Sequence, residues 1–371
     1  SSEKELKLSA FRKGDMVILY SATDSINTNV WNNQILKATI KEITENSIKL
    51  SLRNKLFDNR ILKIKDAQWI IEPDYLDSSN KKLFNSIYKF FTANEIKQKL
   101  ILGLKEPEFN SKTKIISDTL NDNQTEIVEK ALSAKDYFLI QGPPGTGKTS
   151  FVLKSIVENL YFTTNENILV MAYTNRAVDE ICSALKSISD DFKFLRTGSK
   201  ESSEHQDVLI SALSEEITTR ELFIKIRDCR VFVSTVSSVI SNPEILELKK
   251  YDTAIIDEAT QILEPQIVGI LTDVKRFILI GDEKQLPAVV TQDTRNLETK
   301  SETLNKIHLH NLAQSLFERL LMCCKSNNWN SAYAMLKHQA RMHKKIQEFP
   351  NKFFYNNELE LFQQNKWQVA E

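Results

Sequence analysis

The sequence predicts an α/β protein in which a parallel sheet is covered by helices on both faces, preceded by a small β-barrel and a basic helix. Three features lead to this prediction: alternating strands near the N-terminus, a lysine-rich helical repeat after them, and then short apolar runs separated by helix-length segments. The length of 371 residues exceeds what one compact core usually holds, so we expect two or three domains.

Residues 1–78 are predicted to form the small barrel. Apolar and polar side chains alternate over residues 14–20 and 37–52, as they do in half-buried strands. Asn46 and Ser47 are turn-forming residues inside the second of these stretches. We therefore expect a hairpin at this position.

Residues 79–110 are predicted to form a stalk made of one helix. Apolar side chains recur at helical spacing over residues 83–100, and Ser78 or Ser79 is a candidate N-cap. A solvated helix face is the simpler explanation of its basic character, and a helix facing a phosphate backbone is the alternative. From residue 79 to residue 105 the stretch carries one acid, Glu95, and six lysines: Lys81, Lys82, Lys89, Lys97, Lys99 and Lys105.

Residues 111–325 show the pattern of a doubly wound parallel sheet. Five apolar runs are nearly continuous, as expected of parallel strands buried on both faces: 137–140, 168–172, 231–234, 253–256 and 277–280. Asn242 and Pro243 predict a helix start, with asparagine as the cap. Because such a sheet binds its ligand at the carboxyl ends of its strands, the residues after these runs are the candidate site.

Composition excludes several classes of protein. The 49 basic and 49 acidic residues cancel, so any polyanion site must be local. No apolar run approaches the ~20 residues that span a bilayer, and the first ten residues lack a signal-peptide core, so we expect a soluble cytosolic protein, or a nuclear one in a eukaryote. The four cysteines form no CxxC pair and have no histidine partners at ligand spacing, which predicts reduced thiols without a zinc or iron–sulfur site.

A glycine-rich loop follows the first apolar run. Residues 142–149, GPPGTGKT, fit the phosphate-binding pattern G-x-x-x-x-G-K-[ST]. Glycines let backbone N–H groups turn inward around phosphates, and the following helix offers its positive N-terminus to the same anion. Lys148 would reach the β- and γ-phosphates of ATP, and the Thr149 hydroxyl would hold Mg²⁺. The predicted contacts also include Gly142, Gly145, Thr146 and Gly147.

Two further strand ends predict groups at the same site. Asp257 follows the run 253–256 and could hold Mg²⁺, while Glu258 could polarise the attacking water, which indicates hydrolysis of the nucleotide. Two solvated acids at a strand end are the alternative. Gln285 follows the run 277–280, where its neutral amide could bond the γ-phosphate or the attacking water.

The order of these motifs resembles the superfamily 1 helicases, in the 5′→3′ group (superfamily 1B) of the nonsense-mediated-decay RNA helicase and the replicative nuclease–helicase. The blocks that carry the resemblance are LNDNQ (120–124), GPPGTGKT (142–149), AYTNRAVDEI (172–181), VSTVSS (233–238), DEATQ (257–261), GDEKQLP (281–287) and QARMHKKIQEFPNKFFYNNEL (339–359). The last two disfavour a generic P-loop ATPase of the AAA class. The resemblance implies a RecA-like lobe at 111–325, the start of a second at 326–371, and an accessory 1B barrel with a stalk before them.

The resemblance also implies roles for single residues. Gln124 would read the adenine edge, Gln285 would sense the γ-phosphate, and Arg341 would reach that phosphate from the second lobe. A surface amide and a surface cation are the alternatives for Gln124 and Arg341. Small polar side chains would lie along the nucleic-acid strand, where they bond phosphates and sugars without reading bases: Thr174, Asn175, Ser234 and Thr235. The first two could also cap a helix, and both roles are compatible.

Two positions depart from the family's pattern. Ala340 stands where an aromatic residue is common, and Glu283 stands where histidine is common. Neither departure removes a catalytic group, but Glu283 could weaken the coupling between the state of ATP and the contact with the nucleic-acid strand.

The implied activity is ATP-driven 5′→3′ movement on single-stranded nucleic acid by a monomeric helicase, with DNA favoured because DEATQ is closer to the nuclease–helicase's motif. The alternatives are an ATP-gated nucleic-acid-binding module, and a nuclease–helicase whose nuclease lies outside this chain. Only residues 342–371 follow Arg341, whereas a second lobe needs on the order of 150 residues, and the family's fifth and sixth motifs with their arginine finger are absent. We therefore expect a fragment that binds ATP but hydrolyses it poorly and does not unwind.

Overall fold

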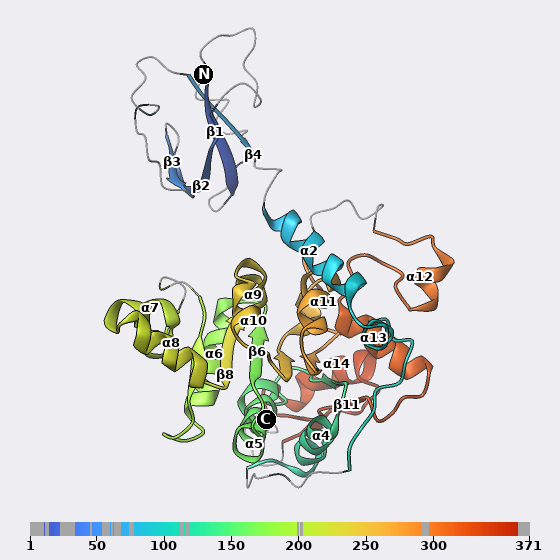
Figure 1. The fold of residues 1–371 in the computed structure, drawn as a ribbon. Helices are drawn as coiled ribbons and strands as arrows, with labels where there is room; N and C mark the ends of the chain where they lie inside the picture. Colours follow the sequence, from blue (N-terminus) through green and yellow to red (C-terminus); the bar gives the residue numbers. More distant parts are fainter. Residues whose placement is uncertain are drawn as a thin grey trace. The chain divides into compact units, whose positions relative to one another are not determined.

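The structure is a computed structural model. It describes residues 11, 15–22, 34–44, 47–53, 60, 62, 68–73, 78–111, 115, 119–198, 200, 203–290 and 297–362, without the side chains of residues 73, 78–81 and 248. The chain divides into two compact units, Ser1–Lys81 and Lys82–Glu371 (Figure 1). Within the described ranges, no helix is both long and apolar enough to cross a bilayer.

The described part of the smaller unit is a four-stranded antiparallel sheet with the strand order β3-β2-β1-β4. Its core consists of Val17, Ala38 and Ile40, each with no exposed surface. No pairing joins β3 to β4 among the residues described here, so the predicted closure into a barrel stays a prediction. The strands are β1 (Met16–Ala22), β2 (Leu36–Ile43), β3 (Ile48–Leu52) and β4 (Gln68–Pro73).

The predicted hairpin joins β2 to β3. Ile43 pairs with Ile48 in antiparallel register, and the Thr44 backbone N–H donates to the carbonyl oxygen of Ser47 at 2.8 Å. Asn46, the other predicted turn residue, lies outside the described residues. The hairpin is therefore confirmed from the residues on either side of the turn.

The larger unit contains a parallel sheet with the strand order β11-β5-β10-β9-β6-β8-β7, seven strands in the described residues. All five predicted runs are strands of this sheet, which confirms the α/β class. The two strands that the sequence did not predict, β7 and β11, lie at the edges and are too short to produce an apolar run. The bounds are β5 (Tyr137–Gln141), β6 (Ile168–Ala172), β7 (Phe194–Arg196), β8 (Val231–Thr235), β9 (Thr253–Ile256), β10 (Arg276–Gly281) and β11 (Tyr333–Met335).

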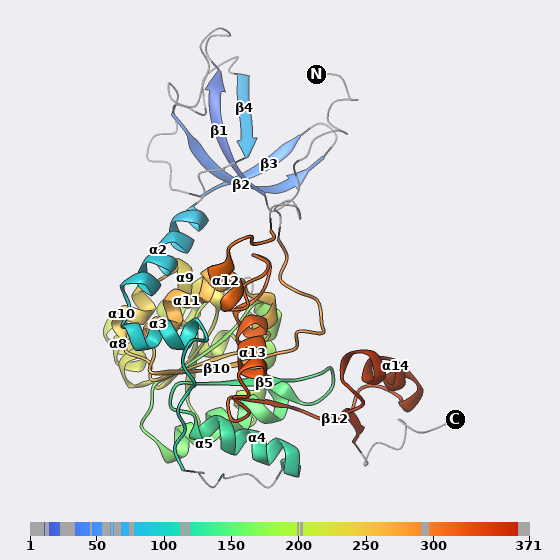
Figure 2. The same ribbon diagram turned by 90° about the vertical axis from the view of Figure 1, so that its right-hand side faces the viewer.

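Helices cover both faces of this sheet, as predicted (Figure 2). Alternate side chains of β5 enter different cores: Phe138 and Ile140 pack with α4 (Asp122–Ser133), α5 (Lys154–Thr163) and α6 (Asn175–Lys186). Tyr137 and Leu139 belong to the opposite core, formed with α3 (Glu95–Ile101), α9 (Val236–Ser241), α11 (Glu264–Thr272) and α13 (Leu316–Ser326). Apart from α2, described below, the remaining α-helices of the described residues are α7 (Ile210–Glu216), α8 (Thr219–Asp228), α10 (Glu244–Leu248), α12 (Glu302–Lys306) and α14 (Lys344–Phe354).

The predicted stalk is two helices rather than one, α2 (Ser78–Thr92) and α3. Asn94 causes the break, because its side chain accepts from the backbone N–H of Ile96 at 2.8 Å and so caps α3. The side-chain amide of Gln98 donates back to carbonyl oxygens of the last turn of α2. The predicted caps Ser78 and Ser79 have no described side chains.

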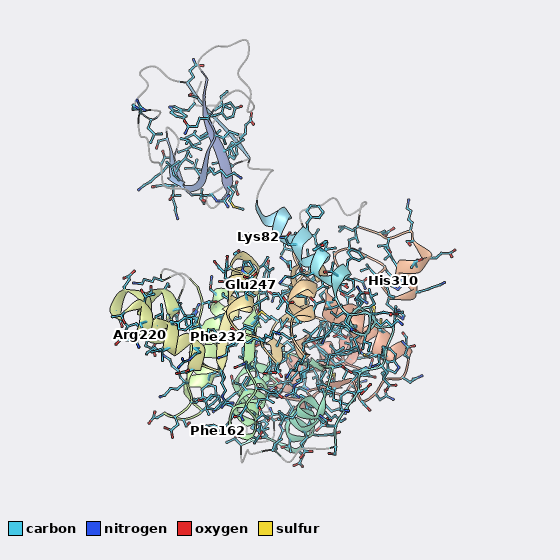
Figure 3. All side chains as sticks on the ribbon, viewed as in Figure 1. Lys82, Phe162, Arg220, Phe232, Glu247 and His310 are labelled. Carbon is cyan, nitrogen blue, oxygen red and sulfur yellow. The ribbon has the colours of Figure 1, made fainter. Side chains whose placement is uncertain are left out.

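Lysines of α2 and α3 bond to other parts of the larger unit. Lys82, labelled in Figure 3, donates from Nζ to the Ser241 hydroxyl at 2.9 Å, and Lys89 pairs with Asp273 at 2.7 Å. Lys97 donates to the carbonyl oxygen just before β10 at 2.7 Å. These three lysines dock the helices onto α9, α11 and β10, a role that neither the solvated face nor the phosphate-facing surface predicted.

The helix predicted at Asn242 begins slightly later. Its first residue is Glu244, with Pro243 in the cap position and no side-chain cap bond. Asn242 instead ends α9, where its amide donates to the Ser238 carbonyl oxygen at 2.9 Å. The proline does mark the helix start, but the asparagine serves the preceding helix.

The last described segment packs against the glycine-rich loop. β12 (His338–Gln339) and β13 (Glu360–Leu361) pair in parallel on either side of α14. The backbone N–H of Ala340 donates to the carbonyl oxygen of Gly145 at 2.9 Å. This bond brings the QARMH block to the carboxyl edge of the main sheet.

Candidate functional site

The glycine-rich loop leaves the end of β5 and enters a helix whose first turns, Lys148–Leu153, have π-helical bonding. Gly145 and Gly147 both have φ of +78°, a conformation that glycine adopts without strain. A Cβ atom on Gly145 would lie 2.5 Å from Cβ of Arg341. Glycine at this position is therefore required both by the backbone and by the close approach of Arg341.

Lys148 lies inside the loop. Its Nζ donates to the carbonyl oxygen of Gly142, and a Cβ atom on Gly142 would lie 2.2 Å from the lysine stem. Burial lowers the pKa of Lys148, while the carboxylates of Asp257, Asp282 and Glu258 act in the opposite direction. This ammonium is surrounded by the loop and by acids, a place where phosphate oxygens can replace the carbonyl.

Asp257 and Thr149 are in direct contact. The Thr149 hydroxyl donates to Oδ2 of Asp257 at 2.5 Å, and the backbone N–H of Glu258 donates to Oδ1 at 2.9 Å. Asp257 is only 2% exposed, and this burial raises its pKa, although the Thr149 hydrogen bond opposes the shift. A hydroxyl and a carboxylate are the oxygen ligands that Mg²⁺ prefers, with further positions left to phosphates and water, so these two residues fit the predicted ion.

Glu258 has an unusual backbone. Its φ is +53°, in the left-handed region that non-glycine residues rarely adopt and that is often found at functional sites. Burial raises the pKa of its carboxyl, and the charge of neighbouring Asp257 raises it further. A carboxylate with a raised pKa is better suited to accept a proton from water.

One cavity of about 580 Å³ joins the predicted catalytic groups. Lys148 and Thr149 come from the loop, the two acids from the end of β9, Gln285 from the loop after β10, and Arg341 from the segment after β12. Residues up to 193 positions apart in the chain therefore meet at one edge of the sheet. They are Lys148, Thr149, Asp257, Glu258, Gln285 and Arg341.

The sequence did not single out two residues of α6 that line the same cavity. These residues are Arg176 and Glu180, which lie one helical turn apart. Nε of Arg176 is 3.4 Å from Oε1 of Glu180. The charge of Glu180 raises the pKa of Glu258, and that of Arg176 lowers it. The only available signal was their helical spacing inside the block AYTNRAVDEI, which does not reveal the face they occupy.

A second group that sequence reasoning missed connects α14 to Gln285. Asp282 is 2% exposed, and its Oδ2 accepts from the Gln285 amide at 2.8 Å and from the Tyr355 hydroxyl at 2.7 Å. Burial and this hydrogen bond raise the pKa of Tyr355, so its phenol stays protonated and donates. Asp282 directly follows β10, and an acid at that strand end was the signal that could have identified it.

Gln124 is buried beside the glycine-rich loop and is not a surface amide. It forms a capping box with Asn121 at the start of α4, and its Nε2 donates to the carbonyl oxygen of Thr146 at 3.2 Å. It also lines a cavity of about 420 Å³ that shares residues 145–147 with the larger one. Its amide retains one N–H and one lone pair for a ligand.

Three of the four residues predicted to contact the nucleic-acid strand lie at the starts of helices. Thr174 caps α6 by accepting from the Ala177 backbone N–H at 3.1 Å, so the capping alternative is correct. Thr235 caps α9 in the same way, accepting from Ser238 at 3.0 Å. Asn175 and Thr235 line a third cavity, of about 650 Å³.

Ser234 does not fit its predicted role. Its side chain has no exposed surface; the hydroxyl accepts from the Thr197 hydroxyl at 2.5 Å and donates to the Thr235 carbonyl oxygen at 3.1 Å. The hydroxyl therefore stabilises the end of β8 through these two hydrogen bonds, and it is not available to a nucleic-acid strand in this structure.

Comparison with known proteins identifies the family. Two protein-family models, each described as an AAA domain and typical of one helicase group, match the chain, one over residues 119–223 and 208–293 and the other over residues 312–370. The DNA replication ATP-dependent helicase/nuclease JHS1 of Arabidopsis thaliana is 29% identical over 94% of this chain and 25% of that protein. The DNA replication ATP-dependent helicase/nuclease DNA2 of Bos taurus is 33% identical over 72% of this chain and 25% of its own length.

The chain belongs to the superfamily 1B helicases. The resemblance predicted from the motifs is thus confirmed. This superfamily 1B chain spans about a quarter of the length of the two curated relatives. Among solved structures, the PRRSV helicase matches with a TM-score of 0.34 and 14% identity, over 64% of this chain and 37% of that one.

Proposed function

We propose that this chain is part of a motor that hydrolyses ATP to move along single-stranded nucleic acid. The observation that supports the proposal most strongly is the cavity at the carboxyl edge of the sheet, where four separate segments supply a cation, two acids, an amide and an arginine. A P-loop used only to store nucleotide needs no second acid, and Glu258 has the raised pKa that suits a base.

The chemistry follows from the positions of these groups. Lys148 and the loop N–H groups would hold the phosphates, and Glu258 would accept a proton from the attacking water. Gln285 and Arg341 would bond the γ-phosphate oxygens and stabilise the charge that develops there. Mg²⁺, held by Thr149 and Asp257, would neutralise charge on the phosphate oxygens.

The nucleic-acid strand would run past the starts of α6 and α9. Thr174, Asn175 and Thr235 lie at these helix N-termini, where backbone N–H groups attract phosphates. Because the net charge is zero, the strand would be held by such local groups rather than by a global field. The proposed track is DNA, which the names of the relatives favour, and the 5′→3′ direction follows the pattern of the family.

The proposed domain arrangement assigns an accessory barrel to residues 1–78, a stalk to 79–110, a RecA-like lobe to 111–325 and the start of a second lobe to 326–371. ATP bound against Arg341 would draw the second lobe toward the first, and hydrolysis would release it. The bond between Ala340 and Gly145 is the connection through which this segment would follow the state of the loop.

The decisive experiment measures ATP hydrolysis by the full-length gene product with no polymer, with single-stranded DNA and with RNA. Lys148→Ala serves as the blank. We expect strong stimulation by DNA and less by RNA, and stimulation by RNA alone would reassign the track. Hydrolysis indifferent to both polymers would refute the motor.

The same samples separate the two alternatives. Strand binding that depends on ATP, without directional displacement of a streptavidin block, would favour the ATP-gated binding module. Cleavage of an end-labelled strand that survives in the Lys148→Ala variant would place a nuclease beside the motor. Displacement without cleavage supports the motor alone.

A further inference from the structure

We propose that Arg176 is a further catalytic residue, which binds the γ-phosphate of ATP as the charge of the transition state develops. The inference rests on the proposed ATP site and deepens it by one contact. Arg176 comes from α6, whereas Arg341 comes from the segment after β12, so two guanidinium groups would reach the phosphate from different segments of the chain.

The position of Arg176 is the first observation that supports this role. The residue lies on the wall of the cavity of about 580 Å³, together with the predicted catalytic groups. Its charge lowers the pKa of the Glu258 carboxyl, so the guanidinium acts on that carboxyl across the cavity. Glu258 is the acid that would receive the proton of the attacking water. A cation that acts on Glu258 is therefore within range of the γ-phosphate.

The charges of the cavity wall give the second observation. Acids outnumber cations among the described residues that line it, so a triphosphate entering this cavity meets repulsion that added positive charge would offset. Lys148 is enclosed by the glycine-rich loop, and on α6 Asp179 is already paired with buried Arg196. Arg176 is the cation that α6 supplies. The full set is Lys148, Arg176 and Arg341 against Asp179, Glu180, Glu204, Asp257 and Glu258.

The guanidinium of Arg176 is available to a ligand. Its side chain is 90% exposed, and its partner Glu180, one helical turn later, is 61% exposed. Exposed ion pairs of this kind contribute little to stability. An arginine that meets phosphate oxygens instead forms paired, charge-assisted hydrogen bonds. A γ-phosphate would therefore replace Glu180 as the partner of Arg176 at small cost.

The contact would act on the hydrolysis step without taking part in proton transfer. The water oxygen forms a bond to the γ-phosphorus, its proton goes to Glu258, and the bond from the γ-phosphorus to the bridging oxygen breaks. The electron pair of that bond stays on the oxygen of ADP, and inorganic phosphate is the second product. Negative charge is spread over the γ-phosphate oxygens during this step. Arg176 would donate N–H bonds to these oxygens and stabilise the transition state more than the ground state.

The test compares how tightly the full-length gene product binds Mg·ADP with and without aluminium fluoride, which takes the place of the γ-phosphate in the transition state. Arg176→Gln should weaken binding of ADP–aluminium fluoride roughly 10²-fold and lower stimulated kcat by a similar factor. Affinity for ADP alone should stay unchanged, which also shows that the variant folds. Arg176→Lys keeps the charge but loses the paired geometry, so it should recover only part of the loss.

Arg227→Gln is the matched control. Arg227 lies on α8, its side chain is 62% exposed, and it does not line this cavity. Both affinities and kcat should therefore stay at the wild-type values. An equal loss in this variant would show that removing any exposed arginine has the same effect, which would overturn the proposal.

Glu180→Gln separates a phosphate contact from a surface ion pair. If Arg176 serves only its pair with Glu180, both glutamine variants break the same pair and should have the same effect, which would refute the proposal. If Arg176 binds phosphate, Glu180→Gln releases it, and ADP–aluminium fluoride should bind as tightly as before or more tightly. Full activity in Arg176→Lys would indicate a long-range field and overturn the contact. If wild type binds no ADP, or Lys148→Ala binds it equally well, the proposed ATP site itself is wrong.

Discussion

At the scale of single residues, Glu258 combines three properties that rarely occur together. It has a left-handed backbone, a partly buried carboxyl and a neighbouring acid, and the last two raise its pKa. The backbone strain and the charge repulsion both destabilise the fold, so their presence at the cavity indicates a role beyond stability. This is the residue on which hydrolysis most depends in the proposed mechanism.

Replacing Glu258 with glutamine should separate binding from turnover. The amide cannot accept a proton, so the stimulated rate should fall by about 10²–10⁴-fold while ATP binding is retained. Because the pKa of Glu258 is raised, its base form appears only at higher pH, and the acid limb of kcat against pH should lie above the ordinary glutamate value of about 4.3. Full turnover in this variant would contradict the general-base assignment.

The two α6 residues provide the control for that profile. Glu180→Gln removes a charge that raises the pKa of Glu258, so the acid limb should move to lower pH. Arg176→Gln removes a charge that lowers it, so the limb should move to higher pH. Shifts in the same direction for both variants would show that the limb reports a different group.

At the scale of elements, the contact between α14 and the end of β10 is the one that links the QARMH block to the proposed phosphate sensor. Tyr355, directly after α14, and Gln285 share the same oxygen of Asp282. A movement of α14 would change the partners of Asp282 and therefore the position of the Gln285 amide. The contact joins residues 73 positions apart, which explains why the sequence pattern did not show it.

Tyr355→Phe should test this link. The variant removes only the hydroxyl, so ATP binding should change little. Stimulated kcat should fall by roughly three- to tenfold, because Asp282, the acceptor of the Gln285 amide, loses the hydrogen bond from Tyr355 that holds it in place. Tyr333→Phe is the matched control, since the Tyr333 hydroxyl donates to exposed Asn330 at 3.2 Å and lies outside this network. Equal effects of the two variants would remove Tyr355 from the proposed coupling.

The docking of α2 makes a second prediction at this scale. Lys89→Glu places two acids together at Asp273, so α2 and α3 should exchange amide hydrogens faster, while the salt dependence of strand binding stays unchanged. Lys99→Glu is the control, because its partner Glu95 lies in the same helix. Adding Asp273→Lys to Lys89→Glu should restore protection. A flatter salt dependence would return α2 to a phosphate-facing role.

At the scale of the whole molecule, the two units have separate cores of very different size. The smaller unit is centred on Val17, Ala38 and Ile40, whereas the larger one has an extensive core on each face of its sheet. Small cores stabilise a fold by only a few kcal/mol. The units are therefore expected to unfold separately.

Hydrogen exchange in increasing urea should resolve two transitions. Peptides from β1–β4 should lose protection first, and those from β5–β10 later. ATP with Mg²⁺ should raise the second midpoint and leave the first unchanged, because the ligand binds only the larger unit in its folded state. A single transition, or a shift of both midpoints, would contradict the independence of the two cores.

The sequence alone determined the features that depend on neighbouring residues. Buried parallel strands produce continuous apolar runs, and a phosphate loop needs glycines at fixed spacing, so β5, β6, β8, β9, β10 and residues 142–149 could all be predicted, together with the family that their order indicates. The acids after β9 and the amide after β10 were found for the same reason. Asp257 and Glu258 directly follow the run 253–256, and Gln285 comes five positions after the end of the run 277–280.

Only the tertiary structure decided the features that depend on contacts between distant residues. Whether the Ser234 hydroxyl faces solvent depends on Thr197 of a neighbouring edge segment, and the role of Asp282 depends on Tyr355. Arg341 lies against Gly145 because the segment after β12 packs on the glycine-rich loop. Local patterns record which side chains are available, but only folding brings distant ones together.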